Sequence, residues 1–401
     1  MKKQTKAILQ KGKGKERREK ALVYNYEKDS VYFAQVSESV KDLAVEELKE
    51  LGAEKIDPVY MGIKFKANQK TLYKIVYLSR MISRVLAPIK TFDCPDSSAI
   101  YKNSMEIKWL DFISRKMTFA IVSNVSDSEV NHSQYAGLRV KDAIADYFRD
   151  MTGKRPDVDK NNPDFLVNLH IRKDKATISV DVSGGALHKR GYREETIIAP
   201  MQEIIAAAII KMSGFDGTSP VYDPMCGSGT LLCEALMRSS NIPSGIFRQK
   251  FGFKVLPDFN ETIWEKVKAE ADAKIKETPK GIIAGSDISI DAVNATKTNL
   301  MGIHYGNNVS IMENGFEDIE DLSNITIVIN PPYGIRLLKD ENLDSFYEKI
   351  GDFLKNKCKG SNAYIYFGDP EYIKNLGLKP AWKKPLKLGQ LDGRLVKYEL
   401  Y

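Results

Sequence analysis

Two short stretches of this chain carry groups that could do chemistry on a bound ligand. The first, at 221–235, contains the run Asp-Pro-Met-Cys-Gly-Ser-Gly-Thr. Pro220 cannot lie inside a central strand, so the residues after it predict a short strand, then a glycine turn and a helix from Thr230. Gly227 and Gly229 allow a sharp turn and close approach of a ligand, while the free N–H groups of the helix start favour an anionic group. Such a loop suits a dinucleotide or S-adenosylmethionine.

The first stretch does not match a dinucleotide loop fully, and a second stretch supports a functional site over a plain βα turn. A dinucleotide loop needs a third glycine, and Leu232 stands in its place. Further along the chain, the apolar run at 325–329 ends in Asn330-Pro331-Pro332-Tyr333. Prolines stop the pairing of a strand, and the carboxyl end of a buried strand is where an α/β sheet places its chemistry. A polar tetrapeptide with an aromatic tip at this position therefore indicates a reactive site that the glycine loop serves.

The two stretches together resemble the amino-methyltransferases that use S-adenosylmethionine, whose hallmark is Asn/Asp-Pro-Pro-Tyr. With the segment Leu187-His-Lys-Arg-Gly-Tyr-Arg193 and the continuation Gly-Ile-Arg-Leu337, they look like the RlmL-type guanine-N2 RNA methyltransferases. That family carries an N-terminal THUMP region, and the resemblance covers roughly residues 30–401. It implies a domain that binds RNA, joined to a domain that methylates N2 of guanosine. The expected substrate is 23S rRNA, and the second choice is tRNA.

The resemblance and the strand ends together define an expected site. The catalytic residues would be Asn330, Pro331, Pro332 and Tyr333. The cofactor-binding residues would be Arg193, Pro200, Asp223, Met225, Cys226, Gly227, Ser228, Gly229, Thr230, Asp287, Ile288, Asn314 and Asn330. Asp287 ends the next buried strand and would accept the ribose hydroxyls. For the adenine amine, the register leaves Asn314 and Asp318 as alternatives.

The amide of Asn330 suits an exocyclic amine. The lone pair of guanine N2 is delocalised into the ring, so a site must localise it and aim it at the methyl group. The side-chain carbonyl of Asn330 and the backbone carbonyl of Pro331 can accept both amine hydrogens, and Tyr333 can stack on the base. No strong base is needed because the donor leaves as a neutral thioether. Cys226 and Cys233 are interpreted as packing residues.

Composition indicates an ordinary globular protein of two or three domains. The 401 residues are 43% hydrophobic and 28% charged. Four cysteines without a C-x-x-C pair and four scattered histidines favour a reducing cytosol and no metal. Neither a membrane span nor a secretory signal is expected, so we predict a soluble cytoplasmic protein. The sequence gives no indication of the oligomeric state.

The net charge of +7 is concentrated at the N-terminus. Residues 1–20 hold nine Lys/Arg and two Glu, so the remaining 381 residues are balanced. We therefore predict a basic flexible arm at 1–29, which could contact a nucleic acid backbone or remain a solvated tail.

The periodicity of the rest predicts an α/β protein. Residues 30–185 alternate predicted strands and helices, including a hairpin with a basic tip at 172–175. This part resembles a ferredoxin-like element merging into a THUMP domain. For residues 186–401 the resemblance implies a Rossmann-like class I methyltransferase domain, with a mostly parallel seven-stranded sheet. We expect a helix at 196–212 opening near Pro200, a helical insertion at 238–280, and a final antiparallel hairpin at 386–401.

Three rival functions remain. Methylation of the same atom in tRNA keeps the chemistry and changes the RNA. DNA adenine-N6 methylation also uses Asn-Pro-Pro-Tyr but gives no reason for a THUMP region, and a silent RNA-binding protein would not need both motifs intact. A 4-thiouridine synthetase is rejected because the segment Ser183-Gly-Gly-Ala-Leu-His188 lacks the Asp and second Ser of its nucleotide loop.

Overall fold

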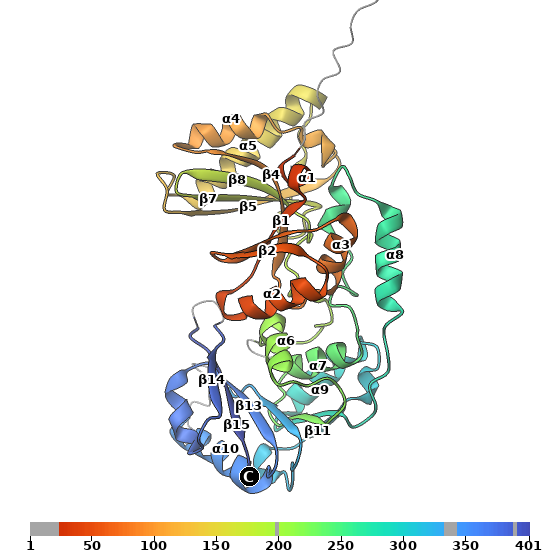
Figure 1. Ribbon diagram of the computed structural model, residues 1–401, viewed down its shortest axis with the longest axis vertical. Helices are drawn as coiled ribbons and strands as arrows, with labels where there is room; N and C mark the ends of the chain where they lie inside the picture. Colours follow the sequence, from red (N-terminus) through yellow and green to blue (C-terminus); the bar gives the residue numbers. More distant parts are fainter. Residues whose placement is uncertain (1–23, 197–199, 333–342, 388–390) are drawn as a thin grey trace, which may run out of the picture.

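The computed structural model describes residues 24–196, 200–332, 343–387 and 391–401. Two β-sheets lie along its long axis, one in each half of the chain (Figure 1). The predicted basic arm at 1–29 falls mostly outside the described residues; its last part contains the short helix α1 (Asn25–Asp29). Within the described residues, no helix is both long and apolar enough to cross a membrane.

The first sheet joins a ferredoxin-like part to a second α/β part through one long strand. Its order is β2-β3-β1-β4-β8-β7-β5-β6. The strands are β1 (Val31–Gln35), β2 (Glu54–Val59), β3 (Gly62–Lys66), β4 (Arg84–Asp93), β5 (Thr118–Ser126), β6 (Asp157–Val158), β7 (Phe165–Arg172) and β8 (Lys175–Asp181). Leu86 of β4 pairs with Phe33 on one side and Asp181 on the other. The expected merging of two elements is therefore a continuous eight-stranded sheet.

Helices with one apolar face cover this sheet. They are α2 (Lys41–Glu50), α3 (Gln69–Leu78), α4 (Ser97–Met105) and α5 (Ser133–Thr152). The 20-residue α5 buries Val140, Ile144 and Phe148 on one side, the spacing of an amphipathic helix. It ends at Gly153, whose φ of 75° is the left-handed conformation that favours glycine at a helix end.

The second sheet has seven strands in the order β11-β10-β9-β12-β13-β15-β14. The strands are β9 (Val221–Asp223), β10 (Ile283–Asp287), β11 (Ser310–Glu313), β12 (Thr326–Ile329), β13 (Asn362–Phe367), β14 (Trp382–Pro385) and β15 (Arg394–Glu399). Only β15 runs against its neighbours. This confirms the predicted mostly parallel α/β sheet. The hairpin, however, begins earlier than expected, because its first strand runs from Trp382 to Pro385, before the predicted start at residue 386.

Helices cover both faces of the second sheet. They are α6 (Glu203–Met212), α7 (Thr230–Ser239), α9 (Ile290–Met301) and α10 (Leu343–Lys357). Alternate residues of β12 enter different cores: Val328 packs with the residues of α6 and α7, whereas Ile327 and Ile329 pack with those of α10. Burial on both faces explains why this strand reads as an unbroken apolar run.

The insertion at 238–280 packs against the first half of the chain. Its helix α8 (Glu261–Asp272) lies beside α3 (Figure 1). The ring of Trp264 meets the ring of Tyr77 edge-on, with 5.3 Å between centroids, and Phe253 lies 4.4 Å from Tyr73. The hydrophobic core of the first half therefore continues into one face of the second sheet, and the two halves share it.

Candidate active site

A cavity of about 530 Å³ opens at the carboxyl ends of β9, β10 and β12. We call it the cofactor cavity. Twelve of the residues expected from sequence line it: Pro200, Asp223, Met225, Cys226, Gly227, Ser228, Thr230, Asp287, Ile288, Asn330, Pro331 and Pro332. Gly229, Arg193 and Asn314 are not in its wall, and Tyr333 lies outside the described residues. The glycine loop and the Asn-Pro-Pro stretch are thus parts of one cavity, although about 100 residues separate them.

Helix α9 holds the glycine loop in shape. Gly229 has φ of 78°, and a Cβ there would lie 2.7 Å from the Thr296 side chain, so only glycine fits without a shift. Thr296 Oγ1 donates to the carbonyl of Gly227 at 2.7 Å, and Asn299 Nδ2 donates to that of Ser228 at 3.0 Å. Sequence reasoning missed both side chains, because their role depends on how α9 packs.

The carboxylate of Asp287 faces the glycine loop. Its Oδ2 accepts from the Gly227 N–H at 2.9 Å, and its Oδ1 accepts from the Ser289 N–H at 3.0 Å. A carboxylate has about four lone-pair sites, so two bonds leave acceptor capacity on the cavity side. This geometry suits a ligand with paired hydroxyl groups.

Asp223 is a second acid of the cavity, and it is buried. Its Oδ1 accepts from the Met225 N–H at 3.0 Å. Burial, with repulsion from Asp287 as a smaller cause, raises the pKa of Asp223 to about 8. The carboxyl is therefore largely neutral at pH 7, and a cation in the cavity would favour its ionised form.

Arg193 bonds the residues that form the cavity wall. Its guanidinium donates to Glu203 Oε1 at 3.0 Å, to the hydroxyls of Ser228 and Thr230 at 3.1 and 3.0 Å, and to the Met201 carbonyl at 3.2 Å. Arg193 therefore positions the cofactor loop and does not touch the cavity.

The helix expected over 196–212 ends at Met212 as predicted but begins at Glu203, so the predicted start near Pro200 was wrong. Its N-cap Gln202 has an extended backbone, with φ of −72° and ψ of 136°. Arg193 binds the preceding carbonyl, which keeps this segment out of the helix. Pro200 consequently lies in the cavity wall before the helix.

Asn330 presents an unsatisfied acceptor. Its Oδ1 is buried and has no hydrogen-bond partner among the described residues. Leaving such a group unpaired costs about 1–3 kcal/mol, so a ligand that brings a donor would be favoured here. Pro331 and Pro332 continue the wall beside it.

The loop after β11 places acids and an aromatic ring in the same wall. A short 3-10 turn, η5 (Phe316–Asp318), brings Phe316, Glu317 and Asp318 to the cavity. Asn314 instead continues the strand, where its N–H donates to the Asp287 carbonyl at 3.0 Å. Of the two alternatives for the adenine amine, the geometry favours Asp318.

The segment before the cavity forms a buried ionic link between the halves. Arg190 is 1% exposed, and its Nε donates to Glu234 Oε1 at 3.2 Å, while its Nη2 donates to the carbonyl of Arg80. Arg80 Nη1 lies 3.5 Å from Glu234 Oε2. Tyr192 is buried nearby. These side chains join the two halves and are not free to contact RNA.

The cysteines pack in the interior. All four are free and buried, and burial raises the pKa of the Cys226 and Cys233 thiols well above the ordinary range. Among the described residues, no cluster of His, Cys, Asp or Glu has the arrangement of a metal site. Cys226 contributes its surface to the cofactor cavity.

Comparisons with known families match three parts of the chain. Residues 190–397 match the RMKL-like methyltransferase domain, residues 95–181 the THUMP domain, and residues 32–86 the RlmL ferredoxin-like domain. The ferredoxin-like and THUMP matches fall in the part of the chain that forms the first sheet, and the methyltransferase match falls in the part that forms the second.

Among curated relatives, a protein of Synechocystis sp. is 36% identical over 371 residues, covering 92% of this chain and 97% of its own. The Ribosomal RNA large subunit methyltransferase K/L of Vibrio campbellii is 33% identical over 375 residues, covering 92% of this chain and 53% of its own. The chain therefore spans nearly the whole first relative and about half of the second.

Solved structures share the fold. One solved as a complex with SAH has a TM-score of 0.79 at 25% identity and covers 92% of this chain and 98% of its own. A possible methylase from Clostridium difficile has a TM-score of 0.78 at 26% identity, with the same coverage. TrmN from Thermus thermophilus, at 14% identity and a TM-score of 0.64, shares the fold alone.

Proposed function

This chain belongs to the RMKL-like methyltransferase family, and we propose that it methylates the exocyclic N2 of a guanosine in 23S rRNA with S-adenosylmethionine. The observation that carries the proposal is the buried Oδ1 of Asn330 in the wall of the cofactor cavity, which has no hydrogen-bond partner among the described residues. Described residues of both motifs expected for the reaction line that cavity. The domain division at 29/30 and 185/186 remains part of the same proposal.

The cavity has the groups that this cofactor needs. Asp287 would hold the ribose hydroxyls, and Asp318 would accept from the adenine amine. Asp223 would face the positively charged end, where a cation lowers the pKa of its carboxyl. S-adenosylmethionine supplies a methyl group on a sulfonium, which departs as a neutral thioether. The protein must then hold the guanine N2 amine in line with that methyl group.

Asn330 performs that placement. Its Oδ1 and the carbonyl of Pro331 accept the two N2 hydrogens, which draws the nitrogen lone pair out of conjugation and aims it at the methyl group. The amine loses one proton after the new N–C bond forms, so no strong base is required. Pro332 limits the space beside the base. Tyr333 is proposed to stack on it.

The choice of 23S rRNA rests on the curated relatives. The K/L relatives are named for the RNA of the large ribosomal subunit, at 33% identity over 92% of this chain. The likeness to TrmN is one of fold only, so a tRNA substrate has weaker support. We place the reaction in the cytoplasm, in keeping with four unpaired cysteines.

Transfer of labelled methyl groups tests this function. The full chain would be incubated with labelled cofactor and, separately, large-subunit rRNA, tRNA and DNA, and the products digested to nucleosides. We expect label in N2-methylguanosine from the rRNA. Label in tRNA alone would change the substrate, and label in N6-methyladenine of DNA would overturn the proposal.

A further inference from the structure

A second cavity, of about 600 Å³, lies in the groove between the two halves of the chain. One wall comes from β5, α5 and the loop at 160–166, and the other from the turn at 184–186 and the insertion at 250–252. It shares no lining residue with the cofactor cavity. We call it the interdomain groove.

Close backbone packing fixes the walls of this groove. Gly184 has φ of 69°, and a Cβ there would lie 2.8 Å from the backbone nitrogen of Gly252. Arg248 binds the same turn, since its Nη1 donates to the Ala186 carbonyl at 2.9 Å and its Nη2 to the Ser183 carbonyl at 2.9 Å. The turn and the insertion are thereby held together before any ligand arrives.

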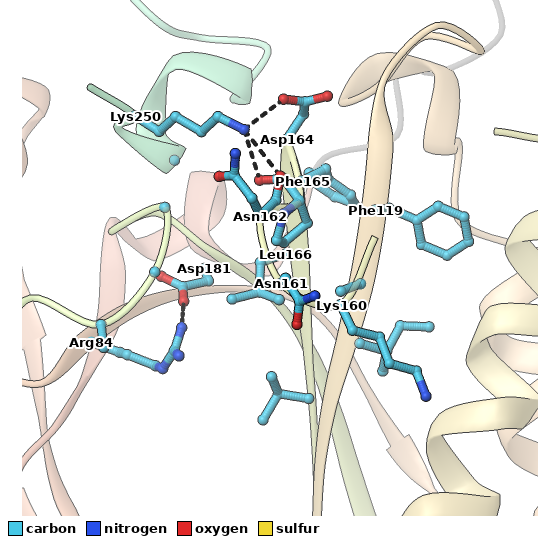
Figure 2. Close-up of a pocket in the computed structure, with 18 of the residues that line it drawn as sticks. Arg84, Phe119, Lys160, Asn161, Asn162, Asp164, Phe165, Leu166, Asp181 and Lys250 are labelled. Atoms are coloured by element: carbon cyan, nitrogen blue, oxygen red, sulfur yellow. Dashed lines mark hydrogen bonds and ion pairs between the residues drawn. The ribbon is translucent and has the colours of Figure 1, made fainter. Parts of the chain in front are cut away.

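The acids of the groove are already neutralised. Lys250 Nζ lies 2.9 Å from Asp164 Oδ1, and Arg84 pairs with Asp181 (Figure 2). Lys250 also donates to the carbonyl of Asn162 at 3.1 Å, which ties the insertion to the opposite wall. These pairs leave the other cations of the groove without a balancing charge inside it.

Two of those cations are exposed and unengaged. Within the described part of the chain, the ammonium groups of Lys160 and Lys189 have no hydrogen-bond or ion-pair partner. They come from opposite walls, one from the loop after β6 and one from the segment after β8. The groove therefore has a surplus of positive charge on both sides.

Apolar side chains lie in the same groove. Val122, Leu138 and Val158 are 41%, 43% and 45% exposed, although large aliphatic side chains are usually buried. The exposed amide of Asn161 also lines the groove (Figure 2). An ion alone would need no apolar surface. Unpaired nucleotides need both features, because their phosphates seek cations and their bases seek apolar faces and amide groups.

From this combination we infer that the interdomain groove binds a single-stranded segment of the RNA substrate, with its phosphates at Lys160 and Lys189 and a base against Leu138. A duplex suits the groove less well, because proteins contact double-stranded RNA across its wide, shallow minor groove and do not enclose it. The inference rests on the proposed function and adds the place where the RNA is held. In this account the groove binds the RNA, and the methyl transfer takes place in the cofactor cavity.

Charge removal tests the phosphate contacts. In the full chain, Lys160→Ala with Lys189→Ala would be compared with Lys266→Ala and Lys274→Ala, two exposed lysines near α8 on the far side of the insertion. The probe is a short single-stranded RNA of mixed sequence, titrated at several salt concentrations. We expect the groove variant to bind about tenfold more weakly and to lose about 1.4 from its log–log salt slope, with the control unchanged. Equal effects in both variants would overturn the inference.

A second comparison separates RNA from other anions. Leu138→Ala should weaken binding of the single-stranded RNA severalfold at every salt concentration, because it removes apolar contact and no charge. A polyglutamate peptide or an RNA duplex that binds the groove more tightly than single-stranded RNA would contradict the assignment. Cofactor affinity, measured by calorimetry, should stay unchanged in all these variants.

The two levels of the argument fail in different ways. If the unaltered chain binds RNA and methylates it, while the groove variant retains native RNA affinity, the groove is not the docking site and the proposed function stands. If the unaltered chain neither binds nor methylates any RNA, the proposed function fails and this inference fails with it.

Discussion

The cofactor cavity and the interdomain groove have opposite hydrogen-bonding character. The cavity offers acceptors: the carboxylate of Asp287, the buried carboxyl of Asp223 and the Oδ1 of Asn330, to which no group of the described residues donates. The groove offers donors, the unengaged ammonium groups of Lys160 and Lys189. A cationic cofactor and an amine suit the first, and a phosphodiester chain suits the second. RNA docking and methyl transfer therefore occupy separate sites. Substitutions in the groove should change RNA affinity, and substitutions in the cavity should change cofactor affinity or the transfer rate.

The largest expected effect concerns Glu234, which joins the halves that carry the two sites. Glu234→Ala would leave the buried guanidinium of Arg190 unpaired, and breaking a buried ion pair costs about 3–5 kcal/mol. We expect this loss in the free energy of unfolding from a denaturant titration. Glu261→Ala, at an exposed pair with Lys254, should lose about 1 kcal/mol or less. Equal losses would mean that the buried link does not hold the halves together.

Asp287→Ala should weaken S-adenosylmethionine binding by about 2 kcal/mol or more, because the carboxylate accepts from the ribose hydroxyls. The matched control is Asp291→Ala, an exposed acid in the first turn of α9. Calorimetry gives both affinities. RNA affinity should not change in either variant, and an unchanged cofactor affinity would remove Asp287 from the site.

The pH dependence of stability reports on Asp223. Its pKa is about 8 in the folded chain and about 3.9 when unfolded, so the folded state holds an extra proton between these values. The free energy of unfolding should therefore be highest below about pH 4 as far as this group is concerned, and fall by up to about 1.4 kcal/mol per pH unit as pH rises toward 8. Asp223→Asn should abolish this slope. Identical pH profiles would show that Asp223 ionises normally.

The smallest effect concerns the predicted arm. If residues 1–20 contact phosphates, deleting them should flatten the salt dependence of RNA binding and leave cofactor affinity unchanged. A salt slope equal to that of the full chain would make the arm a solvated tail.

Sequence reasoning reached the cofactor cavity because its residues lie in two unbroken motifs. A strand followed by a glycine turn, and a strand followed by Asn-Pro-Pro, must both end at the carboxyl edge of a parallel sheet, so their meeting follows from topology. The roles of Thr296, Asn299 and Asp318 are harder to predict from the sequence, because they depend on the packing of α9 and on the register after β11.

The groove was beyond the reach of such reasoning. Its lysines stand about 30 residues apart, and the opposing wall comes from the insertion near residue 250. Lys189 lies in the segment Leu187–Arg193 that carries the resemblance, but nothing in that segment predicts that Lys160 lies across a groove from it. The hairpin tip at 172–175, which the sequence did point to, lies outside its lining. Only the tertiary contact of two halves, set by Trp264 and Tyr77 among others, brings these charges together.

The single-turnover rate of Asn330→Ala tests the central claim most directly. With RNA and cofactor both saturating, the account predicts a methyl-transfer rate lower by about 100-fold or more, the scale for losing a group that positions the reacting atom. Both dissociation constants should remain within about twofold of native, since Asn330 lies apart from the groove and acts on the amine. A native transfer rate in this variant would contradict the assignment of Asn330 to the chemistry, and with it the proposed reaction.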